Sequence, residues 1–172
     1  MKKITLAVLA LSSSLGSFTA LADNHTISMG YAQASVQNLK NIHGGNLQYR
    51  YEWNSPVSGM GSFTFMKGDK SAPEGKAEAK YYSLLAGPAY RINDYISLYG
   101  LAGAAYSKGK FIMQEDKSSM SANSTRFAYA AGVVINPTQD LSVNIGYEGT
   151  TAKMLGEKMN INGFNVGVGY RF

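Results

Sequence analysis

Apolar and polar residues alternate strictly along several parts of the chain. In residues 46–53, NLQYRYEW, every second residue is large and apolar, and the residues between them are Asn46, Gln48, Arg50 and Glu52. A period of two predicts a β-strand whose two faces meet different surroundings. Seven further segments show the same pattern, some of them weakly: residues 27–33, 59–66, 81–92, 95–106, 126–136, 141–148 and 164–172. The pattern therefore predicts an all-β protein of eight strands.

The connections between these segments are alternately short and long. Asn, Pro and Asp, which form tight turns, occupy the short connections at residues 54–56, 93–94 and 136–140. The long connections are four polar stretches: residues 35–45, 67–80, 108–125 and 149–161. This asymmetry is typical of outer-membrane proteins. We expect an eight-stranded antiparallel up-and-down transmembrane β-barrel, with short periplasmic turns, four longer extracellular loops and both termini in the periplasm.

The residue types on the two faces indicate which face points inward. A soluble barrel such as a lipocalin is the alternative, and its water-facing surface would carry many lysines and glutamates. Here the polar face carries mainly Gly, Ala, Ser and Asn, the filling of a narrow interior, with a few isolated charges. The apolar face carries no charge, and its strands end in Tyr, Trp or Phe, as do the aromatic girdles of membrane barrels. The apolar face is therefore predicted to contact lipid.

Six charged residues are predicted to lie inside the barrel. They are all four arginines and two acids, namely Arg50, Arg91, Arg126, Arg171, Glu52 and Glu148. Counting outward from the turn at residues 136–140 predicts that Arg126 pairs with Glu148. Glu52 is the only strand acid near the remaining three arginines, so we expect it to be shared among them or helped by Tyr and Asn side chains.

The N-terminus has the form of a secretory signal peptide. Lys2 and Lys3 precede an apolar run at residues 4–11, and Ala20-Leu21-Ala22 is a small-x-small cleavage site. The alternative is a buried N-terminal helix. We expect residues 1–22 to be the signal peptide and residues 23–172 to be the outer-membrane β-barrel. The chain has no cysteine, so the exported protein is expected to fold without disulfides.

Charge and residue types exclude several classes of protein. The formal net charge of +5 falls to +3 without Lys2 and Lys3, which is too weak and dispersed for a nucleic-acid-binding protein. No constellation for catalysis or metal binding is evident, because His25 and His43 are expected at opposite ends of the barrel. The loop acids Asp69, Glu74, Glu115 and Asp116 are interleaved with lysines and are interpreted as solvated charge. We expect no enzyme activity, no cofactor and no metal.

Surface binding is the function that these residues leave open. Each of the four long polar stretches has one more lysine than acids, so together they carry a charge of +4. The candidate surface-binding residues are Lys40, Lys67, Lys70, Lys76, Lys108, Lys110, Lys117, Lys153 and Lys158. They would serve solubility and contact lipopolysaccharide phosphates, or they would dock anionic host glycans and matrix proteins. A third alternative is addition of a partner strand to an exposed sheet edge.

Several segments resemble the OmpX/Ail/PagC/Lom family of small outer-membrane proteins. They include SMGYAQASVQNLKNIHGGNLQYRYE, AGPAYRINDYISLYGLAGAAY and INGFNVGVGYRF; the last of these, together with VQNLKNI, is most similar to the PagC branch. The resemblance runs from the first strand to Phe172 and fades in the long polar stretches. It implies an eight-stranded barrel in the outer membrane of a Gram-negative bacterium.

The resemblance also implies a role in virulence, through host-cell or matrix adhesion, invasion, serum resistance or intracellular survival. The alternative is a structural outer-membrane barrel that interacts mainly with lipopolysaccharide and has no specific host ligand. The expected partners are outer-membrane lipid and lipopolysaccharide, with host extracellular-matrix proteins, glycans or complement-regulatory proteins as the implied host ligands. We expect the protein to be a monomer.

Overall fold

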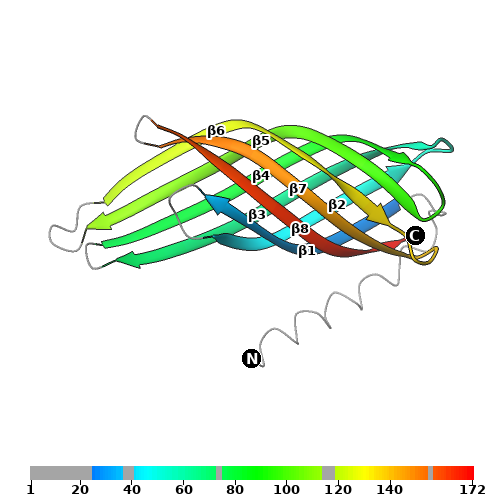
Figure 1. Ribbon diagram of the computed structural model, residues 1–172, viewed down its shortest axis with the longest axis horizontal. Helices are drawn as coiled ribbons and strands as arrows, with labels where there is room; N and C mark the ends of the chain where they lie inside the picture. The colour runs from blue at the N-terminus through cyan, green and yellow to red at the C-terminus, as the bar shows by residue number, and fades with distance from the viewer. Residues whose placement is uncertain (1–24, 37–40, 73–74, 114–118, 155–156) are drawn as a thin grey trace, which may run out of the picture.

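Eight antiparallel strands close into a barrel in the computed structural model of the chain (Figure 1). The structure describes residues 25–36, 41–72, 75–113, 119–154 and 157–172. The strands are His25–Val36 (β1), Ile42–Glu52 (β2), Val57–Ala72 (β3), Gly75–Arg91 (β4), Ile96–Met113 (β5), Ser119–Ile135 (β6), Leu141–Met154 (β7) and Glu157–Arg171 (β8). Each strand pairs with its neighbours in sequence, so the predicted up-and-down topology is confirmed.

Pairing between the first and last strands closes the barrel. Strand β1 pairs with β8 from Thr26↔Arg171 to Val36↔Ile161. Beyond this ladder, the backbone N–H of His25 donates to the carbonyl of Phe172 at 3.1 Å, and the N–H of Phe172 donates to the carbonyl of His25 at 2.9 Å. No sheet edge then faces lipid, where an unpaired backbone group would cost several kcal/mol. The C-terminus lies at the same end of the barrel as the β2–β3, β4–β5 and β6–β7 turns (Figure 1).

The exposure of alternate side chains confirms the predicted orientation of the two faces. On β2, the inward side chains Gln48 and Glu52 are each 2% exposed, whereas the outward Leu47 and Tyr49 are each 45% exposed. A water-soluble protein would bury the second pair and expose the first. On the other strands too, large apolar side chains are exposed on the outward face and polar side chains are buried on the inward face. The apolar face therefore contacts lipid.

The long polar stretches differ from the prediction, because much of each is strand rather than loop. Strand β3 continues to Ala72 and β4 begins at Gly75, and β5 and β6 have 18 and 17 residues. A tilted strand needs only about 9–11 residues to cross a bilayer. The extra residues project beyond it, where water or headgroups can meet both faces. Alternation of apolar and polar residues is not required there, so the hydrophobic pattern could not reveal these strand ends.

The predicted signal peptide, residues 1–22, lies outside the described residues, as does the start of the predicted barrel domain at residues 23 and 24. Within the part of the chain that is described, no helix is both long and apolar enough to cross a membrane.

The barrel interior is filled by a few large side chains that occupy the space left by glycines. Tyr99 on β5 is 4% exposed, and its hydroxyl lies against Gly132 on β6 and Gly146 on β7. A Cβ atom at Gly146 would overlap the Tyr99 hydroxyl oxygen. By contrast, Gly100 is on the lipid-facing side of β5, and a Cβ atom there would meet nothing within 4 Å. Glycine is thus needed at Gly146 for space but not at Gly100.

We predict that Gly146→Val destabilises the barrel, because the valine must displace the Tyr99 ring from a filled interior. Overpacking of this kind costs about 1–3 kcal/mol. Gly100→Val adds a lipid-facing side chain without a clash and serves as the matched control. Urea unfolding in lipid vesicles, monitored by the heat-modifiable gel shift, measures both variants. Equal stability of the two would contradict this account of the interior.

Candidate surface-binding site and buried charge clusters

Three lysines lie side by side on the outer face of the barrel, one on each of β3, β4 and β5. Lys67 is opposite Lys80, and Lys80 is opposite Lys108. All three side chains are exposed. Directly opposite residues on adjacent strands have Cβ atoms about 4.5–5.5 Å apart, and like charges at that distance repel each other. We call Lys67, Lys80 and Lys108 the lysine row; a bound anion would relieve its repulsion.

An aromatic row lies directly beneath the lysine row. Phe65 is opposite Tyr82, and Tyr82 is opposite Tyr106. Their ring centroids are 5.0 Å apart for the first pair and 6.4 Å apart for the second. Aromatic side chains of this kind mark the boundary between hydrocarbon and headgroups. On each of the three strands the lysine is two residues nearer the outer end than the aromatic residue, so the lysine row lies at the level of the lipid headgroups.

The remaining candidate lysines are placed less completely. Lys110 is exposed and opposite Glu78, one step above the lysine row. The structure gives strand positions but no side chains for Lys70, Lys76, Lys153 and Lys158. Lys40 and Lys117 lie outside the described residues. The sequence pattern did not single out Lys80, since only the strand register shows that it connects Lys67 with Lys108.

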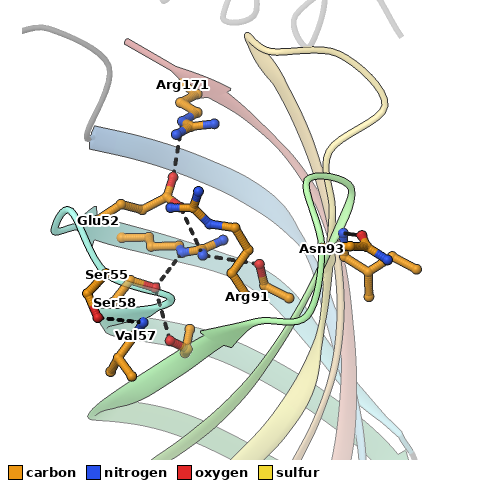
Figure 2. Close-up of polar contacts among 11 residues, drawn as sticks. Glu52, Ser55, Val57, Ser58, Arg91, Asn93 and Arg171 are labelled. Atoms are coloured by element: carbon orange, nitrogen blue, oxygen red, sulfur yellow. Dashed lines mark hydrogen bonds and ion pairs between the residues drawn. The ribbon is translucent and has the colours of Figure 1, made fainter.

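Inside the periplasmic end of the barrel, one carboxylate is shared by three arginines (Figure 2). Glu52 Oε1 lies 3.0 Å from Arg50 and 3.1 Å from Arg91, and Glu52 Oε2 lies 3.0 Å from Arg171 Nε. The contact with Arg171 is an ion pair without a well-aligned hydrogen bond to Oε2. The predicted sharing of Glu52 is confirmed, and we call these four residues the Glu52 cluster.

Arg50 is held in the Glu52 cluster by two serines on other strands. Its Nε donates to Ser58 Oγ at 2.8 Å, and a terminal nitrogen donates to Ser97 Oγ at 3.1 Å. The Arg50 and Glu52 side chains are 4% and 3% exposed, whereas those of Arg91 and Arg171 are 33% and 23% exposed. The cluster thus has a buried ion pair at its centre and two guanidinium groups that reach a more open space.

Glu148 is the second buried acid, and its partners are neutral hydroxyl groups from across the barrel. The Tyr81 hydroxyl donates to Glu148 Oε1 at 2.5 Å, and the Thr64 hydroxyl donates to Oε2 at 3.0 Å. Tyr81 and Glu148 are 2% and 5% exposed. Hydrogen bonds to a charged acceptor are stronger than neutral ones. Together these bonds join β3, β4 and β7 inside the barrel.

The predicted pairing of Arg126 with Glu148 is wrong. In the structure Glu148 is opposite Ala130, and the β6–β7 pairing ends at Ala128↔Thr150. Arg126 lies beyond this point, where it is exposed and its Nε donates to Ser124 Oγ at 3.3 Å. Counting residues outward from the β6–β7 turn gave the wrong register for these two strands, because Ala130 and not Arg126 is opposite Glu148. Arg126 is therefore not a charge of the closed interior.

These arrangements favour binding over chemistry. In the residues that the structure describes, no group of three His, Cys, Asp or Glu side chains could hold a metal ion. His25 lies at the periplasmic end and forms a hydrogen bond with the Tyr49 hydroxyl, whereas His43 is opposite Lys67 near the outer end. An exposed lysine row, an aromatic row below it and a polar interior define the class of the protein as an outer-membrane β-barrel.

Comparison with known proteins agrees with this class. The model of the outer membrane protein beta-barrel domain family matches residues 4–172, and the chain belongs to that family. It is 44% identical to the virulence membrane protein PagC of Salmonella typhimurium and 38% identical to outer membrane protein X of Escherichia coli K12, each over 100% of both chains. The predicted family resemblance is confirmed. The relatives also confirm that the chain is a barrel protein of the Gram-negative outer membrane and not an enzyme.

A solved structure of a relative supports both the fold and its relation to attachment proteins. The chain has a TM-score of 0.76 and 37% identity to Ail, the attachment invasion locus protein of Yersinia pestis, in complex with the heparin analogue sucrose octasulfate. The match covers 87% of this chain and 99% of that one.

We predict that Glu52→Gln lowers the free energy of unfolding, because three guanidinium groups then lie close together without a counter-charge. Breaking a buried ion pair costs roughly 3–5 kcal/mol, and the partial exposure of Arg91 and Arg171 places this change toward the lower end. Glu78→Gln, on the exposed face, should cost less than about 1 kcal/mol. Urea unfolding in lipid vesicles compares the two, and equal losses would argue against the shared carboxylate.

A second test concerns the partners of Glu148. Tyr81→Phe and Glu148→Gln should each destabilise the barrel by about 1.5–3 kcal/mol, since a hydrogen bond to a charged group is lost or weakened. The double variant should lose less than the sum of the two. Arg126→Gln combined with Glu148→Gln should be additive to within about 0.5 kcal/mol, because those side chains do not meet. Non-additive changes in the free energy of unfolding in this double-mutant cycle would show that Arg126 and Glu148 do interact, contrary to the structure.

Proposed function

We propose that the chain is an outer-membrane virulence protein that attaches the cell to anionic host glycans through the lysine row. The observation that carries this proposal is the alignment of Lys67, Lys80 and Lys108 on three adjacent strands. Sulfated glycans present closely spaced negative charges, and a row of neighbouring ammonium groups matches such a ligand better than scattered lysines would. One step above, Lys110 is opposite Glu78, so the site proposed for the anion is limited to the lysine row.

The comparisons support the same proposal. The relatives include a virulence membrane protein, and the attachment invasion locus protein of Yersinia pestis was crystallised with a heparin analogue. Host matrix and complement-regulatory proteins remain predicted partners of the chain. That the protein is a monomer also remains a prediction. We also propose that residues 1–22 direct export and are removed.

Lipopolysaccharide is the second candidate ligand, favoured by the height of the lysine row. The row lies immediately above Phe65, Tyr82 and Tyr106, where headgroup phosphates of the outer leaflet are found. Lysines at this level would hold the barrel within a lipopolysaccharide layer. A barrel with only this interaction would be structural and would have no specific host ligand.

We predict that replacing Lys67, Lys80 and Lys108 with Gln weakens heparin binding at least tenfold and reduces its dependence on salt, since screening acts on exposed charges. The matched control replaces Lys76, Lys153 and Lys158 with Gln, which removes the same charge from other positions. Binding to immobilised heparin is measured with the barrel in phospholipid nanodiscs at several salt concentrations. Equal losses in the two triple variants would indicate a general charge effect and overturn the row as the site.

Nanodiscs that contain lipopolysaccharide separate the two candidate ligands. If the row serves host glycans, heparin binding persists in these nanodiscs and is still lost in the variant of the lysine row. If lipopolysaccharide occupies the row, heparin binding disappears in these nanodiscs while the variant changes the association with lipopolysaccharide instead. The second result would reject the attachment proposal in favour of a structural barrel.

A further inference from the structure

A histidine continues the lysine row onto strand β2. His43 is directly opposite Lys67, the end of the row on β3. Its side chain is exposed, whereas that of its neighbour Ile42 is buried inside the barrel, so His43 lies on the outer face with the row. Adjacent strands are about 4.8 Å apart, which gives a line about 14 Å long from His43 to Lys108. We call His43 and the three lysines the extended row.

Neutral groups surround His43 on two sides. On β1 it is opposite Gln33, whose Oε1 accepts a hydrogen bond from the Tyr31 hydroxyl at 3.0 Å. On its own strand the residues two positions away are Asn41 and Gly45. In the part of the chain that the structure describes, the His43 ring has no hydrogen-bond or ion-pair partner. Both of its nitrogens can therefore donate to a ligand when the ring is protonated.

Among the described residues, the charged groups that face His43 lie on β3 and beyond it. Lys67 is directly opposite, and Asp69 is one diagonal step further out. Asp69 is opposite Glu78, and Glu78 is opposite Lys110, so these acids lie outside the extended row. Within the described pairings, each residue directly opposite a member of the extended row is either another member or neutral. A proton on His43 therefore adds charge that no directly opposite acid cancels.

The charge of the extended row depends on pH through its histidine alone. Histidine is the side chain whose charge ordinarily changes between pH 5 and 8, whereas lysine stays charged throughout that range. The sulfate groups of a glycan also stay ionised there, so acidification changes the protein and not the ligand. Because an anion favours the protonated ring, binding of the anion and uptake of the proton strengthen each other.

We propose that His43 is a fourth cation of the attachment site and makes it bind sulfated glycans more tightly in mildly acidic surroundings. This inference rests on the function proposed for the lysine row, and it adds a binding residue and a pH response to that site. One additional charge contact at an exposed position strengthens binding about three- to fivefold. The affinity of the extended row for sulfated glycans thus rises as the pH falls.

Heparin binding at about pH 7.5 and about pH 5.5 tests the proposal, with the intact barrel in phosphatidylcholine nanodiscs. The unaltered protein is expected to bind about three- to fivefold more tightly at the lower pH. His43→Gln should bind equally at both pH values, with the affinity that the unaltered protein has at the higher one. His43→Lys should also bind equally at both, but with the affinity that the unaltered protein has at the lower one.

The other histidine of the chain provides the matched control. His25 lies at the periplasmic end, where its ring forms a hydrogen bond with the Tyr49 hydroxyl. His25→Gln should therefore keep the full response of heparin binding to pH. The heat-modifiable gel shift shows that each variant is folded before its binding is measured.

The outcomes separate this inference from the function on which it rests. A pH response that persists in His43→Gln would assign the effect to another group, such as Asp69, and overturn the role of His43. An unaltered protein without a pH response would also overturn it; if the variant of the lysine row still loses heparin binding, the function proposed for the row stands without His43. Unchanged heparin binding in the variant of the lysine row would count against the row itself, and with it against His43 as its fourth cation.

Discussion

Satisfaction of backbone hydrogen bonds within lipid is the constraint on which the rest of this structure depends. A strand in the hydrocarbon region cannot leave N–H and C=O groups unpaired, so the sheet must close on itself. Pairing of β1 with β8, extended by the reciprocal bonds between His25 and Phe172, achieves that closure. Closure with eight strands leaves a narrow interior. The outward face is then free to be apolar, while the inward face must combine glycine with a limited set of larger side chains.

The two buried acids show two ways of placing charge in that interior. Glu52 lies near the periplasmic end and is neutralised by arginines on β2, β4 and β8. Glu148 has hydroxyl donors from Tyr81 and Thr64 instead. The first arrangement leaves guanidinium groups exposed in a cavity, and the second is enclosed. The Glu52 cluster therefore stabilises the barrel beside a cavity at the periplasmic end, whereas the Glu148 site joins three strands in the buried interior.

The outer surface owes its chemistry to strands that continue beyond the bilayer. Because β3, β4 and β5 remain paired above the aromatic row, their register holds Lys67, Lys80 and Lys108 next to one another. Flexible loops would allow these ammonium groups to separate and reduce their repulsion. A paired sheet keeps the charges together, and an anionic ligand gains from the repulsion that it relieves. The same rigidity that the barrel needs in lipid thus supports the proposed attachment site outside it.

The amino-acid sequence by itself determined the number of strands, the lipid-facing side of most of them, the turn positions and the sharing of Glu52 by three arginines; in residues 95–106 Gly and Ala on both faces left the lipid-facing side open. These features follow from local alternation and from the scarcity of acids on the inward face. Only the tertiary structure decided that Glu148 meets Tyr81 rather than Arg126, and that Lys80 completes a row with Lys67 and Lys108. Alternation shows which face a side chain occupies but not its height relative to other strands. Register and strand tilt set those heights, and they arise only when the whole sheet closes.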